Sequence, residues 1–239
     1  MPMNANNIDL SVSIPLYNEE DNVRSVIKEL YDVLKNTGLK YEIIAVNNGS
    51  YDNTGKILNK LKRKYKNIKI VSIKKNLGYS YGINQGLKKS NGRIIGFMDG
   101  DSQVKSNVIP LLYKELENNK DIQLIKVKRV RRMDGFNRLF QSRIYNKLFA
   151  VLFGIDSIDI NGKPKLMKRE FYDKINIISR DWFIDAEIML NLKKHNYKFA
   201  EIAVQSDKRN KGESKVKLSA TLQFLKNMLK YKLGFFYRK

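Results

Sequence analysis

The sequence contains no cysteine and only one histidine, His195, among its 239 residues. The absence of cysteine excludes disulfide bonds, thiolate zinc sites and cysteine nucleophiles. A single histidine argues against a histidine-based metal cluster and against a Ser-His-Asp triad. The commonest zinc sites and nucleophilic triads are therefore removed from consideration.

Long hydrophobic runs are also missing. The longest is LFAVLFGI at residues 148–155, whereas a membrane-spanning helix needs about 18 or more consecutive apolar residues. The first ten residues, MPMNANNIDL, lack the apolar core of an export signal. We therefore expect a cytoplasmic protein without a membrane span or a cleavable signal.

Acidic residues are scarce relative to basic ones. Lys and Arg number 46 and Asp and Glu number 24, so the formal net charge is 46 − 24 = +22. Such an excess favours anionic partners, which include nucleic acid, an anionic membrane surface and phosphorylated substrates. With 42% hydrophobic residues, the chain has the composition of a folded protein.

The first hundred residues alternate short β-branched runs with helical patterns, which predicts an α/β fold with a mostly parallel sheet covered by helices on both faces. Ligands of such sheets bind beyond the carboxyl ends of the strands. The expected strands are SVSIPL, YEIIAV, IKIVSI and RIIGFM, at residues 11–16, 41–46, 68–73 and 93–98.

We expect a catalytic-type domain at residues 1–215 and a basic amphipathic tail at residues 216–239. From Lys215 to the end there are seven basic residues and no acidic one. The tail's apolar residues recur at helical spacing: Leu218, Leu222, Leu225, Leu229, Leu233 and Phe236. This pattern fits either a helix lying on an anionic membrane or a helix packed on the domain.

The segment IIGFMDGDSQ ends an apolar strand with two carboxylates, Asp99 and Asp101. Residues two apart in an extended segment project to the same side, so both carboxylates can reach one divalent cation, while Gly100 allows a tight turn. Oxygen ligands suit Mg²⁺ or Mn²⁺. Taken alone, an Asp-x-Asp is more often a solvated turn.

The context of this segment resembles the inverting family 2 glycosyltransferases of GT-A fold, and among them the polyprenyl-phosphate glycosyltransferases such as dolichyl-phosphate mannose synthase. The matching segments occur in the same order as in that family and extend over roughly residues 10–216. They are SIPLYNEEDNV, EIIAVNNGSYDNT, KKNLGYSYGINQG, GRIIGFMDGDSQ, DINGKPKLMKRE, DWFIDAEIML and RNKGESKV.

This resemblance implies that Asp99, Asp101 and Gln103 hold the metal ion, which would be Mg²⁺ or Mn²⁺. The ion would neutralise the diphosphate of a UDP- or GDP-sugar donor. The resemblance also assigns a nucleoside pocket to three residues near the end of the first strand: Pro15, Tyr17 and Glu19. Packing for Tyr17 and a helix cap for Glu19 are the simpler alternatives.

One departure from the family pattern lies after the second strand. The family has Asp-Asp-Gly-Ser there, whereas this chain has Asn47 and Asn48 before Gly49 and Ser50. An amide can still donate to and accept from a nucleobase. The negative charge is lost, however, so the identity of the base stays open, and so does an inactive relative.

The resemblance implies a role for basic residues in the second half of the chain, because related enzymes have arginines there that bind phosphate groups. Arg129, Arg132, Arg138 and Arg143 lie in one such stretch, and Arg209, Ser214 and Lys215 in the R-x-x-G-x-S-K loop. The guanidinium fork suits phosphate. We select Arg129, Arg143, Arg209 and Lys215; a solvated basic face is the alternative for the others.

Asp185 and Glu187 in FIDAEIML resemble the acidic pair of the family. Side chains two positions apart on a helix diverge, so only one can face the substrate, and we favour Asp185. It would be the base for a hydroxyl acceptor. A lipid phosphate needs no base, and Asp185 would then orient the acceptor loop or the sugar. Trp182 is expected to pack or to line the sugar site.

The sequence therefore predicts an inverting, metal-dependent glycosyltransferase that transfers a sugar from a nucleotide sugar to a polyprenyl phosphate on the inner face of the cell membrane. Transfer to a sugar or protein hydroxyl is one alternative. A non-enzymatic protein that binds polyanions is another, and the net charge is its only support. Nucleic acid is not an expected partner, because no recognition motif is present.

Overall fold

The computed structural model describes residues 8–132, 136–207 and 218–234. Strands and helices alternate, as the sequence predicts, and the fold is α/β. The strands are β1 (Leu10–Leu16), β2 (Tyr41–Asn48), β3 (Ile68–Ile73), β4 (Ile94–Phe97), β5 (Ile122–Arg132), β6 (Lys165–Lys168) and β7 (Lys198–Ser206). The helices are α1 (Val23–Leu34), α2 (Thr54–Lys64), α3 (Tyr79–Lys88), the 3₁₀ turn η1 (Ser106–Val108), α4 (Ile109–Asn118), α5 (Phe136–Phe153), α6 (Arg169–Tyr172), α7 (Ile184–Lys194) and α8 (Leu218–Lys232).

The strands form one sheet in the order β3-β2-β1-β4-β6-β5-β7. Four pairings are parallel, namely β1 with β2, β1 with β4, β2 with β3, and β5 with β7, which confirms the mostly parallel sheet. Strand β6 is antiparallel to both of its neighbours, β4 and β5. The loop that precedes β6 therefore reaches the sheet edge where β4 ends, because antiparallel neighbours bring opposite ends together.

Helices cover both faces of the sheet. Neighbouring residues along the central strands belong to different hydrophobic clusters, one on each face. In β4, Ile94 belongs to the hydrophobic cluster that contains α1, α2 and α4, whereas Ile95 and Phe97 belong to the cluster with α3, α5 and α7. In β6, Leu166 and Met167 divide in the same way. Successive strand residues point to opposite faces, so strands buried on both sides are apolar throughout.

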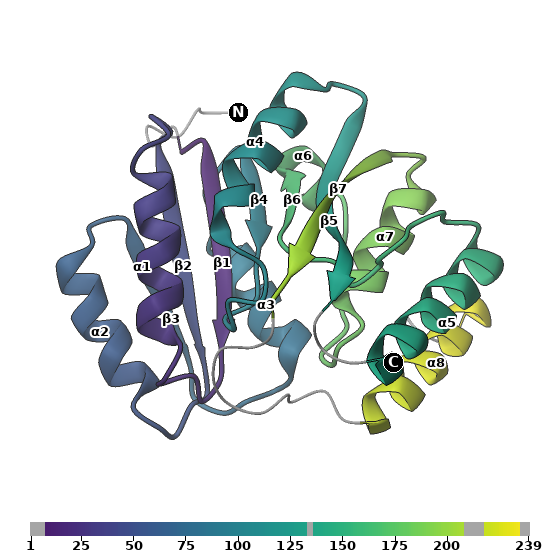
Figure 1. The fold of residues 1–239 in the computed structure, drawn as a ribbon, viewed down its shortest axis with the longest axis horizontal. Coiled ribbons are helices and arrows are strands. Elements are labelled where there is room, and N and C mark those ends of the chain that lie inside the picture. The colour runs from purple at the N-terminus through teal and green to yellow at the C-terminus, as the bar shows by residue number, and fades with distance from the viewer. Residues whose placement is uncertain (1–7, 133–135, 208–217, 235–239) are drawn as a thin grey trace.

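The C-terminal helix α8 lies beside α5, at the lower right of Figure 1. Met228 is fully buried, and Phe224, Leu225 and Tyr231 pack against the same cluster. Leu229 and Leu233 face solvent instead. The leucine repeat expected for the tail is thus divided between core and surface. Phe236 lies outside the described residues, and the division at residue 215 stays a prediction.

Candidate active site

The carboxyl ends of three neighbouring strands meet at one edge of the sheet. Leu16 of β1 pairs with Asn47 of β2, and Ser13 of β1 pairs with Phe97 of β4. The polar segments that follow these strands are therefore adjacent, as expected for parallel strands. In Figure 1 these strand ends lie toward the bottom of the molecule.

Asp99 is surrounded by groups from two other segments. Its carboxylate accepts a hydrogen bond from the Tyr79 hydroxyl, and the Lys163 Nζ lies 3.5 Å from its Oδ2. The Tyr79 ring stacks on Trp182, with 4.5 Å between ring centroids, and the Lys163 ammonium lies 5.0 Å from the centroid of the Tyr79 ring. Burial is the largest cause that raises the pKa of Tyr79, and the charge of Asp99 is the next. The Tyr79 hydroxyl therefore stays protonated and acts as a hydrogen-bond donor.

Asp101 lies in the turn after Asp99 and accepts the Gln103 N–H at 3.2 Å. The left-handed residue of this turn is Ser102, with φ of 57°, and not Gly100 as a tight glycine turn would require. Gly100 has a different role, because a Cβ there would lie 2.7 Å from the Leu16 Cδ2 and 3.3 Å from the Pro15 carbonyl oxygen. It lets the carboxylate turn pack closely on the end of β1.

The oxygen ligands available at this turn suit a cation of the Mg²⁺ or Mn²⁺ type. Asp99 and Asp101 provide carboxylate oxygens alone, and within the described part of the chain no cluster of three or more acidic, His or Cys side chains could enclose a metal ion. Mg²⁺ is typically held by one or two carboxylates together with substrate phosphates. The roles of Asp99, Asp101 and Gln103 as ligands stay predictions.

Asp185 lies in the first turn of α7 and is 1% exposed. Its carboxylate pairs with the fully buried Lys165 and lies 3.2 Å from the Lys163 Nζ. Burial by itself raises the pKa of Asp185, but the charges of the two lysines outweigh this effect and hold the pKa below its ordinary value. Asp185 is therefore an ionised, weakly basic carboxylate.

Glu187 points away from this cluster, as the divergence of the two positions predicts. It accepts the backbone N–H groups of Ile178 at 2.9 Å and Ser179 at 3.0 Å. Burial raises the pKa of Glu187. Its position indicates a brace for the loop that leads into α7.

The expected nucleoside residues lie at the end of β1. Pro15 is buried within the strand, and the Tyr17 ring meets Tyr51 edge to face at 6.2 Å between centroids. Glu19 is mostly buried and accepts the Asn22 side-chain amide at 2.7 Å, just before α1 begins. This contact joins two side chains and is not a helix cap, since the N-cap of α1, Asn22, makes no side-chain capping bond. A role for Glu19 in nucleotide binding stays a prediction.

The two asparagines after β2 have different environments. Asn47 is half-buried, and its Oδ1 accepts the Ser50 N–H at 3.1 Å. Asn48 is 3% exposed and its Nδ2 donates to the Gly78 carbonyl at 3.1 Å and to the Asn76 Oδ1 at 3.4 Å. Asn48 thus ties the end of β2 to the loop that starts α3, a contact that an ionised aspartate cannot make.

The basic residues chosen for phosphate recognition are distributed unevenly. Arg129 forms a bidentate pair with Asp159, at 2.7 and 3.0 Å, whereas Arg143 is exposed on α5. Arg209 and Lys215, together with Ser214, lie outside the described residues, and so do the side chains of Arg132 and Arg138. Asp159 occupies the guanidinium fork of Arg129, and the phosphate roles of all these residues stay predictions.

Sequence reasoning missed Tyr79, Lys163 and Lys165. The last two belong to the segment DINGKPKLMKRE, in which Lys165 and Lys168 enclose the two apolar residues of a short strand. Lys165 is fully buried within β6, and burial lowers its pKa to about 7 although Asp185 opposes this shift. A lysine inside a buried strand requires a carboxylate partner, and that requirement was the available signal.

Comparison with known proteins identifies the relatives of this chain. The profile described as "Glycosyl transferase family 2" matches residues 11–176. The dodecaprenyl-phosphate galacturonate synthase of Rhizobium johnstonii is 27% identical over 227 residues, which are 93% of this chain and 66% of that protein. The dolichol-phosphate mannosyltransferase of Pyrococcus furiosus is 26% identical over 230 residues, 92% of this chain and 62% of that protein.

The chain thus spans less than two thirds of the length of these relatives. Among solved structures, glucosyl-3-phosphoglycerate synthase from Mycobacterium tuberculosis, in complex with Mn²⁺, UDP and phosphoglyceric acid, superposes with a TM-score of 0.73 at 20% identity. The match covers 95% of this chain and 79% of that one. At this identity the likeness shows the shared fold.

Proposed function

The chain belongs to glycosyl transferase family 2, and from this premise we propose that it transfers a hexosyl unit from a nucleotide sugar to a polyprenyl phosphate with inversion at the anomeric carbon. The acceptor phosphate oxygen would form the bond to that carbon while the bond to the donor diphosphate breaks. The donor is a UDP- or GDP-sugar, and the reaction takes place at a membrane surface. The two polyprenyl-phosphate enzymes named above support this choice of acceptor.

The environment of Asp185 is the observation that carries the proposal. This carboxylate is buried between Lys163 and Lys165, and their charge holds its pKa low. A general base works best when its pKa is near the working pH, so Asp185 is poorly suited to deprotonate a hydroxyl acceptor. A phosphate is already ionised and needs no base.

The remaining residues have distinct roles in this proposal. A divalent cation held by Asp99 and Asp101, with Gln103 beside them, would stabilise the departing nucleoside diphosphate. Tyr79 keeps the Asp99 carboxylate oriented through its hydroxyl. Lys163 lies next to both acidic groups and is the described cation best placed to meet a donor phosphate.

The proposal is tested with a panel of nucleotide sugars, Mn²⁺ or Mg²⁺, and four acceptors: a short-chain polyprenyl phosphate, the matching polyprenol, a sugar alcohol and 3-phosphoglycerate. We expect transfer only to the polyprenyl phosphate, and none in the presence of chelator. Transfer to the polyprenol or the sugar alcohol would reject the argument from Asp185. Transfer to 3-phosphoglycerate would reject the lipid acceptor.

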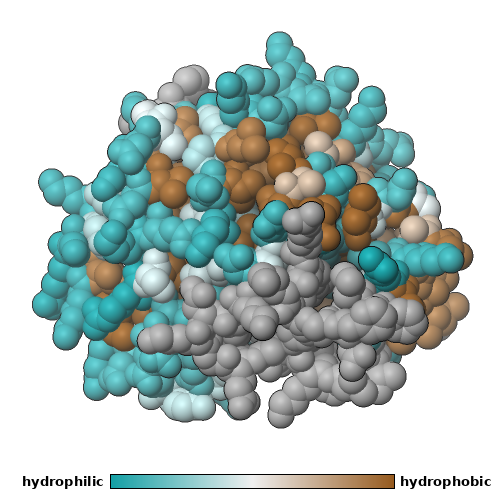
Figure 2. All heavy atoms as spheres, viewed as in Figure 1, coloured by the Kyte–Doolittle hydropathy of each residue, from teal (hydrophilic) through white to brown (hydrophobic). Residues whose placement is uncertain are grey.

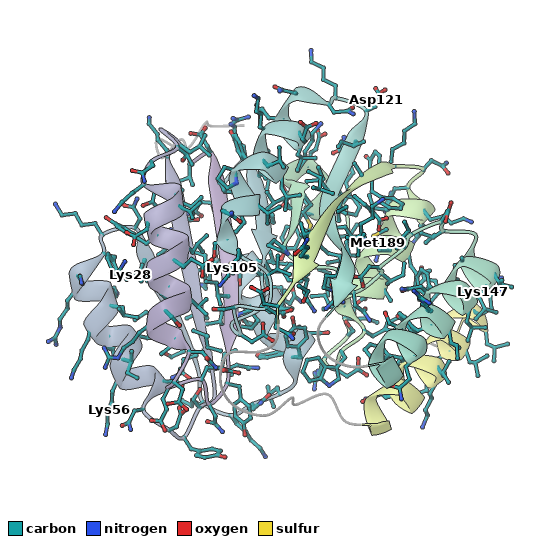
Figure 3. The ribbon with its side chains drawn as sticks, in the orientation of Figure 1. Lys28, Lys56, Lys105, Asp121, Lys147 and Met189 are labelled. Carbon is teal, nitrogen blue, oxygen red and sulfur yellow. The ribbon has the colours of Figure 1, made fainter. Side chains whose placement is uncertain are left out.

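Asp101→Asn tests the metal site in the same assay. We expect at least a hundredfold loss of transfer with a free energy of unfolding within about 0.5 kcal/mol of the parent, because this carboxylate lies in a surface turn. Asp121→Asn is the matched control, since Asp121 is exposed at the opposite end of the molecule (Figure 3). Full activity of Asp101→Asn in chelator would exclude a metal role for this residue.

A further inference from the structure

Helices α5 and α8 lie side by side and run in the same direction. Tyr145 meets Phe224 at 5.2 Å between ring centroids, and Phe153 meets Tyr231 at 5.8 Å, so residue numbers increase together along both helices. The Lys232 Nζ also donates to the Leu152 carbonyl at 2.8 Å. The two helices therefore form one continuous surface on their outer side.

This outer side carries four exposed hydrophobic residues, which we call the α5–α8 stripe. Ile144 and Val151 of α5 are 50% and 75% exposed, and Leu229 and Leu233 of α8 are 56% and 65% exposed. The members of each pair are seven and four positions apart, so each pair lies on one helix face. Figure 2 shows hydrophobic residues at the right margin, where α5 and α8 lie.

The rotation of 100° per residue places each pair on the side of its own helix that faces away from the core. On α5, Leu148 and Leu152 lie between the buried residues and the stripe, and Leu152 contacts α8 through Lys232. On α8, Leu225 packs against the core beside Leu229. Both pairs thus face away from the buried cluster on two helices that pack side by side.

The charge around the stripe is of one sign. Neither α5 nor α8 contains an acidic residue. Exposed lysines flank the stripe on both sides, with Lys147 on α5, at the right in Figure 3, and Lys226 and Lys230 on α8. A second copy of the chain would bring these like charges together, whereas anionic lipid head groups would neutralise them.

The stripe is also connected to the active site. Gln223 and Asn227 of α8 donate to the Asp181 carboxylate at 2.8 and 2.7 Å. The next residue, Trp182, stacks on Tyr79, whose hydroxyl binds Asp99. The helix that carries half of the stripe is therefore bonded directly to the wall of the carboxylate site.

We propose that the α5–α8 stripe docks on an anionic lipid surface, with its four apolar side chains inserted among the head groups and its lysines on the phosphates. This inference rests on the proposed function, because docking would bring the active site to a membrane-bound acceptor. Amphipathic helices with apolar and basic groups of this kind bind at the bilayer interface. Among the described residues, no helix is long and apolar enough to cross a bilayer.

The test is co-sedimentation of the full chain with phosphatidylcholine vesicles, with or without 30 mol% phosphatidylglycerol. The test variant is Val151→Asp with Leu229→Asp. The matched control is Leu111→Asp, because Leu111 is also an exposed leucine, 45% accessible, but lies on α4. Circular dichroism verifies folding; if the double variant does not fold, Lys147→Glu with Lys226→Glu replaces it.

We expect the parent to partition at least tenfold more strongly into the anionic vesicles, and the double variant to lose at least tenfold in partitioning, since inserting one such side chain changes a partition coefficient by roughly tenfold. The partitioning of the Leu111→Asp control should stay within twofold of the parent. High salt should release only part of the parent. No binding by the parent, or equal losses in the control, would overturn the proposal.

Two further readouts separate the alternatives. Sedimentation velocity without lipid tests for a self-interface, and a parent dimer that Val151→Asp with Leu229→Asp dissociates would overturn lipid docking. Transfer to a short-chain, water-soluble polyprenyl phosphate tests the proposed function by itself. Parent protein that binds vesicles but transfers nothing would reject the function and leave docking supported. Normal transfer without vesicle binding would reject docking alone.

Discussion

Lys163 illustrates how one side chain connects the two acidic centres of the site. Its ammonium lies 3.2 Å from Asp185 and 3.5 Å from Asp99, and it is largely buried. Burial lowers the pKa of Lys163, but the two carboxylates outweigh this effect and raise the pKa above its ordinary value. Lys163 therefore remains charged and attracts anions, whereas it repels any cation that approaches Asp99.

Lys163→Met should consequently tighten the binding of Mn²⁺ by roughly tenfold in the absence of donor, and raise the KM for the nucleotide sugar. The free energy of unfolding should fall by about 1–3 kcal/mol, because Asp185 keeps Lys165 as a partner. Direct Mn²⁺ titration measures the first effect. Lys147→Met is the control, and weaker Mn²⁺ binding by Lys163→Met would show that the ammonium positions Asp99 instead of competing with the metal.

Asn48 is a second residue whose chemistry depends on its partners. Asn48→Asp replaces the donor that binds the Gly78 carbonyl with a carboxylate that cannot donate. We expect a loss of about 1–3 kcal/mol in the free energy of unfolding at neutral pH. Asn47→Asp should stay within about 0.5 kcal/mol, since its oxygen already accepts the Ser50 N–H.

Donor competition with the same two variants tests whether these amides read the base. We expect Asn48→Asp to shift the preference between uridine and guanosine donors. Unchanged stability of Asn48→Asp would contradict the contact with Gly78, and an unchanged preference in both variants would show that this loop does not select the base.

Among the individual elements, α8 combines a core face and a surface face. Met228 is fully buried, whereas its neighbour Leu229 is 56% exposed. Met228→Ala should lower the free energy of unfolding by about 2–4 kcal/mol, because it leaves a cavity in the hydrophobic cluster beneath α8. Leu229→Ala should change it by no more than about 0.5 kcal/mol.

Urea unfolding of both α8 variants at one protein concentration measures the difference. Equal effects of the two substitutions would show that α8 does not pack on the domain in solution. The pair of variants also separates stability from lipid docking, since only Leu229 belongs to the stripe.

Across the molecule as a whole, buried ion pairs connect the strands of the second half of the sheet with each other, with α7 and with the loop before β6. Asp159 pairs with Arg129, Asp185 with Lys165, and Glu201 with Lys126. Burial acts to raise the pKa of each carboxyl, but the basic partners outweigh it and hold all three pKa values below their ordinary range. Each carboxylate therefore stabilises the fold while it is ionised.

Acid should unfold the protein steeply for this reason. Since the folded pKa values are lower than the unfolded values near 4, the unfolded state binds more protons below about pH 4 and stability falls as the pH falls. The slope should approach about 1.4 kcal/mol per pH unit for each carboxylate. Urea unfolding between pH 6 and 3 measures it, and Asp159→Asn should show a shallower slope. A urea concentration at the unfolding midpoint that does not change with pH would contradict this account.

Local sequence patterns were sufficient to predict the alternation of strands and helices and the position of Asp99 and Asp101 at a strand end. Both depend on short-range periodicity, because apolar runs of strand length and helical repeats are encoded within ten to fifteen residues. The divergence of Asp185 and Glu187 on α7 follows from helix geometry in the same way. The motifs shared with family 2 then supplied candidate roles for residues that lie far apart in the chain.

The partners of these residues, by contrast, are set by tertiary contacts. The antiparallel entry of β6 brings Lys163 and Lys165 to Asp185 and Asp99, and a one-residue shift in register would turn Lys165 to the other face of the sheet. The brace from Asn48 and the packing of α8 on α5 likewise join segments far apart in the chain. Such contacts depend on the path of the connections and on which face each strand presents, and neither is encoded in a local pattern.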